Sequence, residues 1–201
     1  MSVFVVEGDT DLPYVRKVAA DAGLELTVEV DAGGKAAIDR DLEKYQSAGR
    51  AMPWVVFRDL DADAPCAGEF VREAGVGGSR WFRLRLAVRE LESWILADAP
   101  GLSTFLRVAP KWLPERPDEE ADPTRSLLAV AARAPAAMRR RLIAAPGGAT
   151  AVGPLYEATL IEFGERFWDV GRASQRSPSL RRARASLREL AREWEKFVGG
   201  V

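Results

Sequence analysis

Apolar residues recur with two different periods in the first half of the chain. Four short runs, apolar throughout or alternating, have the length and composition of β-strands: 2–6, 24–30, 54–57 and 81–88. Apolar positions three and four residues apart predict helices up to Gly23, over 36–49 and 66–75, and from 89 onward. Strands that alternate with helices form βαβ units, so this pattern predicts an α/β fold with a mainly parallel, Rossmann-like sheet flanked by helices.

The strand pattern stops after Pro100, and the rest of the chain is expected to be helical. Residues 110–124 are rich in proline and acidic side chains, which is typical of a surface loop. Helical spacing follows at about 125–145, 152–168 and 178–198, with an interruption at 145–150. Ser177 and Pro178 are typical of the N-cap and the first position of the last helix. We therefore expect an α/β domain over 1–108, with an all-helical C-terminal region over 109–201 packed on it.

Composition limits the chemistry that this chain can perform. The 201 residues are 47% hydrophobic and 29% charged, with one cysteine and no histidine. This excludes a disulfide framework, a thiolate zinc site, and catalysis by Ser-His or Cys-His pairs. A metal would have to be bound by oxygen, which favours Mg²⁺, Mn²⁺ or Ca²⁺. There is no apolar run of membrane-spanning length and no signal sequence, so we expect a cytoplasmic protein without membrane contact.

Acidic side chains follow three of the predicted strands. They are Glu7 after the first strand, Asp59, Asp61 and Asp63 after the third, and Glu90 and Glu92 after the fourth. The carboxyl ends of parallel strands lie along one edge of a sheet, so these acids are expected to converge there. Glu7, Asp59 and Asp61 would then share a divalent cation that neutralises them. Alternating aspartates after a strand also occur in turns and helix caps, and that alternative stays open.

Two stretches end a predicted strand in acidic residues. "VFVVEG" ends an apolar strand in Glu-Gly, and "VVFRDLDAD" ends a later strand in Asp-x-Asp. Together they resemble the signature of the TOPRIM family. TOPRIM domains occur in topoisomerases, primases, ribosomal-RNA maturases and the OLD nucleases. Asp11, four residues after Glu7, resembles a second acid of OLD nucleases. The segment "RLAVRELESWILAD" is similar to one in free-standing TOPRIM-like proteins of bacteria and phage defence loci, and the resemblance covers about residues 1–98.

This resemblance implies a Mg²⁺- or Mn²⁺-dependent nuclease that cuts DNA or RNA in phage defence or nucleic-acid processing. Its implied metal ligands are Glu7, Asp59 and Asp61, with Asp11 and Asp63 completing a second metal site and Glu7 also transferring protons. Glu92 is a further catalytic candidate, and the choice between it and Glu90 stays open. The late basic residue of such nucleases has no counterpart here, so Lys35 and Arg58 are proposed to stabilise transition-state charge.

The chain has no Walker motif, which leaves a second function open. OLD nucleases carry an ABC-type ATPase fused to their TOPRIM domain. This chain is therefore alternatively interpreted as a non-catalytic effector or regulatory subunit of a separate ATPase of that type.

Charge is unevenly distributed between the two halves of the chain. Residues 1–100 contain 12 Lys and Arg against 18 Asp and Glu, whereas 101–201 contain 17 against 12. Basic residues recur at helical spacing in the last predicted helix: Arg181, Arg184, Arg188, Arg192 and Lys196. One interpretation is a surface that binds nucleic-acid phosphates through Arg184 and Arg188, with a second basic cluster at 139–141. The other is an ordinary solvated helix face.

Overall fold

Four parallel strands form the sheet in the computed structural model, which describes residues 1–145 and 151–200. The strands are β1 (Ser2–Val6), β2 (Leu26–Asp31), β3 (Trp54–Asp59) and β4 (Phe82–Ala87). Their order is β2-β1-β3-β4, and every neighbouring pair is parallel. The prediction of a parallel α/β sheet is therefore confirmed. The chain first moves from β1 to β2 and then crosses back to β3, so the strand order reverses between β1 and β3.

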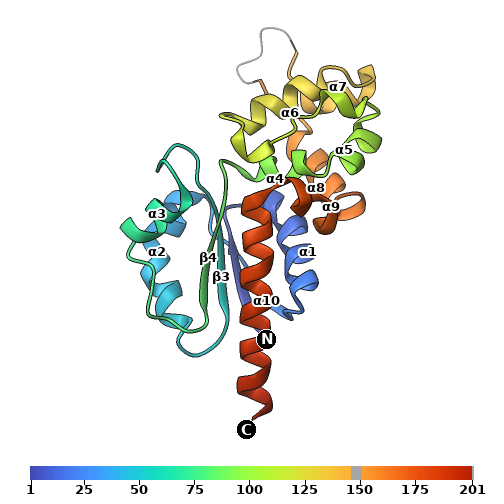
Figure 1. Cartoon of the computed structure of the whole chain (residues 1–201). Helices are drawn as coiled ribbons and strands as arrows, with labels where there is room; N and C mark the ends of the chain where they lie inside the picture. Colours follow the sequence, from blue (N-terminus) through green and yellow to red (C-terminus); the bar gives the residue numbers. More distant parts are fainter. Residues whose placement is uncertain (146–150, 201) are drawn as a thin grey trace.

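Helices cover both faces of this sheet (Figure 1). Helix α1 (Leu12–Ala22) lies on one face, and α2 (Lys35–Ala48) and α3 (Ala67–Glu73) lie on the other. Successive strand residues point to opposite faces, so Phe4 and Val6 join the core cluster with α1, while Val5 joins the cluster with α2. This alternation decides on which face each side chain at a strand end begins.

The remaining helices follow β4 in the chain. They are α4 (Leu91–Ala97), α5 (Ala99–Leu106), α6 (Pro123–Ala131), α7 (Ala136–Leu142), α8 (Tyr156–Arg166), α9 (Val170–Arg176) and α10 (Pro178–Gly199). Short 3₁₀ turns lie at η1 (Asp9–Asp11), η2 (Pro110–Trp112) and η3 (Pro117–Glu119). Helices α5 to α9 gather beyond the end of the sheet at which α4 begins (Figure 1). We call this group, with η2 and η3, the helical lobe.

One predicted helix is divided in the structure. The expected helix at 125–145 is two helices, α6 and α7, with Pro135 at the N-cap of the second. Proline lacks an N–H and disfavours helical geometry in the residue before it, so a continuous helix could not pass this position. The predicted interruption at 145–150 falls mainly on residues 146–150, which lie outside the described residues.

Helix α10 returns from the helical lobe to the sheet and packs against α1 and β4. Its start agrees with the prediction, because the Ser177 hydroxyl accepts a hydrogen bond from the Leu180 amide at 3.1 Å and Pro178 is the first helical residue. Its buried face joins the core cluster that also contains residues of β1, α1 and the lobe. The two regions expected at 1–108 and 109–201 thus share one continuous core.

A buried network joins α4 to the last two helices. The Trp168 indole donates to the Trp94 carbonyl at 2.9 Å, and the Trp94 indole donates to the Ser179 hydroxyl at 2.7 Å. Asp98 has no exposed surface and pairs with the Arg172 guanidinium through two hydrogen bonds of 2.7 and 2.8 Å. These contacts fix the helical lobe relative to the sheet edge. Throughout residues 1–145 and 151–200, each helix is too short or too polar to cross a membrane.

Candidate functional site

Two of the predicted site residues lie where the strand order reverses. Glu7 follows the last residue of β1, and Asp59 is the last residue of β3, the neighbouring strand. The Asp59 backbone N–H donates to Glu7 Oε1 at 2.8 Å, so the two chain segments are directly connected. In open α/β sheets, the crevice at such a reversal is the usual position for a ligand.

Asp11 joins these residues through the turn after β1. Its Oδ2 accepts hydrogen bonds from the Glu7 and Gly8 amides at 3.0 and 3.2 Å, which holds η1 against the end of the strand. Asp11 and Asp59 both line a small cavity beside Trp94. The second acid thus occupies the same sheet edge as the first two.

Glu92 is the fourth carboxylate of this group, and the structure separates it from Glu90. The Tyr156 hydroxyl donates to Glu92 Oε1 at 2.9 Å. Glu90 instead accepts from the amide and the hydroxyl of Thr124 at 3.0 and 2.7 Å, which ties the start of α4 to α6. The choice between the two acids stays open, because Glu92 raises the pKa values of Asp11 and Asp59, whereas Glu90 lines a cavity at the same sheet edge.

Glu7, Asp11, Asp59 and Glu92 form what we call the acidic cluster. Burial, followed by repulsion from Glu7 and Glu92, raises the pKa of Asp59 well above its ordinary value. Burial is also the main cause that raises the pKa of Asp11 to about 7 and the pKa values of Glu7 and Glu92. Within the described ranges, no Lys or Arg lies at ion-pairing distance from any of the four carboxylates. Such uncompensated acids are typical of functional sites.

The other two aspartates of "DLDAD" are neutralised by the protein itself. The Lys35 ammonium, at the start of α2, lies 2.5 Å from Asp61 Oδ2 and 3.1 Å from Asp63 Oδ2. Asp63 also pairs with the Arg58 guanidinium at 2.7 Å. From the sequence, a bound metal cation was expected to neutralise Asp61, but in the structure Lys35 supplies that positive charge. Lys35 therefore lies at the rim of the site. Asp61 and Asp63 lie on the side of the site that is nearer to α2.

The Arg58 side chain is held by other side chains of the protein and is not accessible to a substrate. Its guanidinium forms two hydrogen bonds with Asp39 of α2, at 2.7 and 2.8 Å, and lies 4.3 Å above the ring of Phe70. Only 3% of the residue is exposed. Arg58 directly precedes Asp59 in β3, and successive strand side chains point to opposite faces. The residue proposed to stabilise transition-state charge thus lies on the α2 face, away from Asp11 and Glu92.

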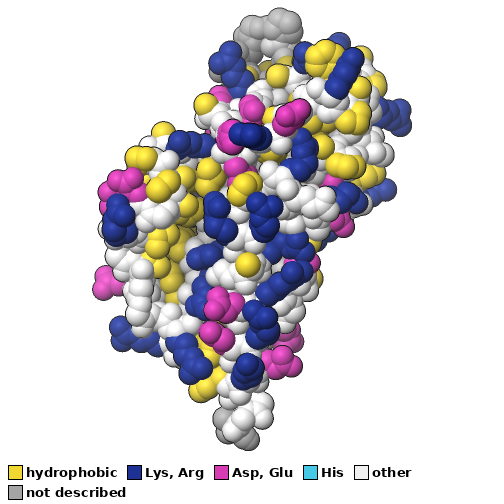
Figure 2. All heavy atoms as spheres, viewed as in Figure 1, with side chains coloured by type: hydrophobic (Ala, Val, Ile, Leu, Met, Phe, Trp, Pro, Cys, Tyr) yellow, Lys and Arg dark blue, Asp and Glu magenta, His cyan; other side chains and the backbone are white. Residues whose placement is uncertain are grey.

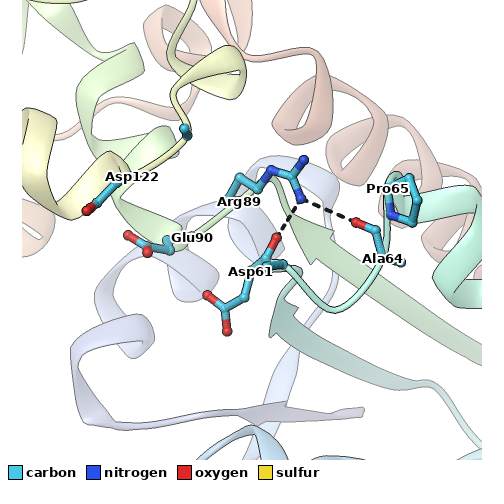
Figure 3. Close-up of a pocket in the computed structure, with 8 residues that line it drawn as sticks. Asp61, Ala64, Pro65, Arg89, Glu90 and Asp122 are labelled. Atoms are coloured by element: carbon cyan, nitrogen blue, oxygen red, sulfur yellow. Dashed lines mark hydrogen bonds between the residues drawn. The ribbon is translucent and has the colours of Figure 1, made fainter.

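A cavity of about 620 Å³ opens between the sheet edge and the helical lobe, and its lining includes Asp61 and Glu90, each two residues from a member of the acidic cluster in the chain. Figure 3 shows Asp61, Arg89, Glu90 and Asp122 around it. Arg89 donates to the backbone carbonyls of Asp61 and Ala64 at 2.7 and 3.2 Å, which fixes the turn after β3. We call this space the edge cavity.

Several residues of this region were not predicted from the sequence. Arg89, Asp122 and Tyr156 line the edge cavity or contact the acidic cluster. Arg89 had a local signal, because it directly precedes the two acids after β4. Asp122 and Tyr156 had none, since they reach the site only through the docking of the helical lobe.

The two α10 arginines that were predicted to contact nucleic acid are paired with a carboxylate of the protein itself. The Arg184 guanidinium forms two hydrogen bonds with Asp21 of α1, at 2.9 and 2.7 Å, and Arg188 lies 3.0 Å from the same carboxylate. Arg184 is half-buried, so its main role is to fix α10 on α1. The helical periodicity did not reveal this contact because it treats the whole polar face as solvated.

The donor set of the acidic cluster suits a hard divalent cation. It consists of oxygen ligands only, and their mutual repulsion would be relieved by a bound cation. Within the part of the chain that the structure describes, however, no three acid or thiol side chains are already arranged as metal ligands. The cation shared by Glu7, Asp59 and Asp61 therefore stays a prediction, and Asp61 is held instead by Lys35.

No protein-family model, curated protein or solved structure matches this chain significantly.

Proposed function

We propose that this protein hydrolyses phosphodiester bonds of nucleic acid with the help of Mg²⁺ or Mn²⁺. The observation that carries the proposal is the acidic cluster at the strand-order reversal. Burial raises the pKa values of all four carboxylates there, repulsion within the cluster adds to this at Asp11 and Asp59, and among the described residues none of the four has a basic partner at ion-pairing distance. Repulsion of this kind is unfavourable unless a ligand relieves it. The resemblance of "VFVVEG" and "VVFRDLDAD" to the TOPRIM signature supports the same conclusion.

The acidic cluster would hold the cation through Glu7, Asp59 and Asp11. Glu92, oriented by the Tyr156 hydroxyl, completes the negative surface around them. A bound Mg²⁺ or Mn²⁺ supplies Lewis-acid chemistry, because it polarises a phosphoryl oxygen and neutralises developing charge. Burial raises the pKa of Glu7, which favours a role in accepting and returning a proton.

Lys35 provides a positive charge at the rim of the site. Its ammonium is partly exposed and pairs with Asp61 and Asp63. We infer that a phosphate oxygen in the edge cavity attracts this ammonium and that Asp61 retains it at the rim between turnovers. The pKa of Lys35 is raised by its hydrogen bond to Asp61, so the ammonium stays charged at neutral pH.

Cleavage by the purified chain tests the proposal. Supercoiled plasmid and single-stranded DNA and RNA are incubated with Mg²⁺ or Mn²⁺, and Asp59→Asn is compared with the wild type. We expect cleavage by the wild type and a loss of at least about 100-fold in the variant. Asp63→Asn is the matched control, because it removes the same charge four residues after β3 ends, outside the acidic cluster.

Metal binding is measured separately from cleavage. A cation that binds only the native state raises its melting temperature, so Mg²⁺ or Mn²⁺ should stabilise the wild type and not Asp59→Asn. A wild type that neither cleaves nor responds to the metals contradicts the proposal. Metal binding without cleavage favours the alternative function, an effector subunit of a separate ATPase.

A further inference from the structure

A second groove lies along the free edge of β4. The strand is the last of the sheet, so its outer edge has no partner strand among residues 1–145 and 151–200. The groove has a volume of about 270 Å³ and runs between α3 and α10. Its lining is Ala67, Gly68 and Val71 of α3, Leu84, Arg85 and Leu86 of β4, and Ser179, Arg182 and Ala183 of α10. Figure 2 shows this hydrophobic floor with Lys and Arg side chains along its α10 side.

The two arginines of this groove have no acidic partner. Throughout the described residues, no carboxylate lies within ion-pairing distance of Arg85 or Arg182. Arg85 donates one hydrogen bond, from Nε to the Leu84 carbonyl at 2.5 Å. An arginine has five N–H donors, so both terminal amino groups of Arg85 are left for a ligand. Burial, with repulsion from Arg83 and Arg182, lowers the pKa of Arg85 to about 10.

Protection of the sheet edge explains only part of this arrangement. Charged side chains on an edge strand discourage pairing with another chain, and Arg83 donates to the Phe82 carbonyl at 2.9 Å much as Arg85 does to Leu84. Arg182 plays no part in that protection, because it belongs to α10. Its presence brings a second unpaired positive charge to the same groove, and an anion would relieve their repulsion.

We propose that this groove binds a backbone phosphate of a single nucleic-acid strand, held by the guanidinium groups of Arg85 and Arg182. The planar guanidinium matches a phosphate through paired hydrogen bonds. The choice of ligand rests on the proposed function. One segment connects the two places, since residues 61–65 help line the edge cavity and residues 67–71 line the groove. A nucleic-acid strand that follows this segment would pass from the groove to the edge cavity.

Binding without catalysis tests this site. The probe is a fluorescein-labelled oligothymidylate of about 15 nucleotides, and fluorescence anisotropy is measured in EDTA over a range of salt concentrations. For one lost phosphate contact on a single strand, the slope of log affinity against log salt should flatten by about 0.7. We expect this change in Arg182→Ala, whose exposed side chain makes no ion pair, and in Arg85→Ala/Arg182→Ala.

The control is Arg50→Ala, which removes one exposed arginine that forms no ion pair in the described structure and lies outside the groove lining. This variant should keep the wild-type slope. An unchanged slope in Arg182→Ala, or an equal change in the control, would overturn the proposal. The groove could instead bind free phosphate. In that case inorganic phosphate would stabilise the wild type but not Arg182→Ala, and the oligonucleotide would not bind; this result would overturn the nucleic-acid strand as the ligand.

The nuclease assay separates this site from the proposed function. If Arg182→Ala weakens binding in EDTA while the wild type cleaves nothing with either metal, the groove stands and the proposed function fails. If Asp59→Asn abolishes cleavage while Arg182→Ala binds as the wild type does, the proposed function stands and the groove fails.

Discussion

Replacing Asp11 with asparagine removes one charge from the acidic cluster and keeps the shape of the side chain. The asparagine oxygen can still accept the hydrogen bonds from the Glu7 and Gly8 amides, so the turn after β1 should persist. The variant therefore isolates the cost of holding an ionised carboxylate at this position. That cost depends on pH, because only the wild-type residue titrates.

The magnitude follows from the pKa of Asp11, which is raised from its ordinary value of 3.8 to about 7. Between these values the native state binds a proton that the unfolded chain has released, so wild-type stability falls as pH rises. A tenfold difference in proton affinity corresponds to about 1.4 kcal/mol, so the cost reaches at most about 4 kcal/mol above pH 7. Asp11→Asn should be as stable as the wild type near pH 4 and more stable by up to that amount at pH 8.

Urea unfolding in EDTA, repeated from pH 4 to pH 8, measures this difference directly. Asp63→Asn is a control of opposite sign, because hydrogen bonding to Arg58 lowers the pKa of Asp63. The charged form of Asp63 stabilises the native state above its ordinary pKa, and this stabilisation is lost as pH falls through the lowered value. Asp63→Asn should therefore be less stable than the wild type at neutral pH. A stability difference for Asp11→Asn that does not change with pH would refute the electrostatic account of the acidic cluster.

Two further predictions concern how the helical lobe is attached to the α/β region. Arg172→Met leaves the fully buried Asp98 carboxylate without its cation and should lower the free energy of unfolding by about 3 kcal/mol in a urea titration. Arg116→Met, which breaks an exposed pair, should change the free energy of unfolding by less than about 1 kcal/mol, and equal effects of the two variants would contradict the prediction. Gly164→Ala would place a methyl group 2.9 Å from the Tyr14 ring and should cost about 1 to 3 kcal/mol in the same titration; a more stable variant would show that α8 and α1 are less tightly packed than described.

The sheet and its acidic edge could be predicted because they depend on local patterns. Short runs of apolar and β-branched residues marked the strands, and the rule for parallel sheets then placed Glu7 and Asp59 at one edge. The same period of two implies that Arg58 and Asp59 point to opposite faces. Applied at that position, it would have assigned Arg58 to the face covered by α2.

The partners of the charged residues could not be predicted in this way. Lys35 reaches Asp61 from the first position of α2, and Asp21 reaches Arg184 from α1, more than 160 residues earlier in the chain. A helical pattern distinguishes an apolar face from a polar one, but it does not tell which part of the polar face another helix covers. The ion pairs of Arg184 are a tertiary contact of this kind.

The position of α10 has a consequence for how the protein folds as it is synthesised. The ribosome releases the four strands early, but α10, which packs on β4 and α1, consists of residues 178–199. Until these residues emerge, part of one sheet face has no covering helix, and Trp81 lacks the ring of Trp194 that lies 5.1 Å from it in the finished fold. Exposed apolar surface of this kind attracts other nascent chains and the chaperones that prevent their aggregation. We therefore expect the nascent strands to remain a chaperone substrate until translation of α10 is complete.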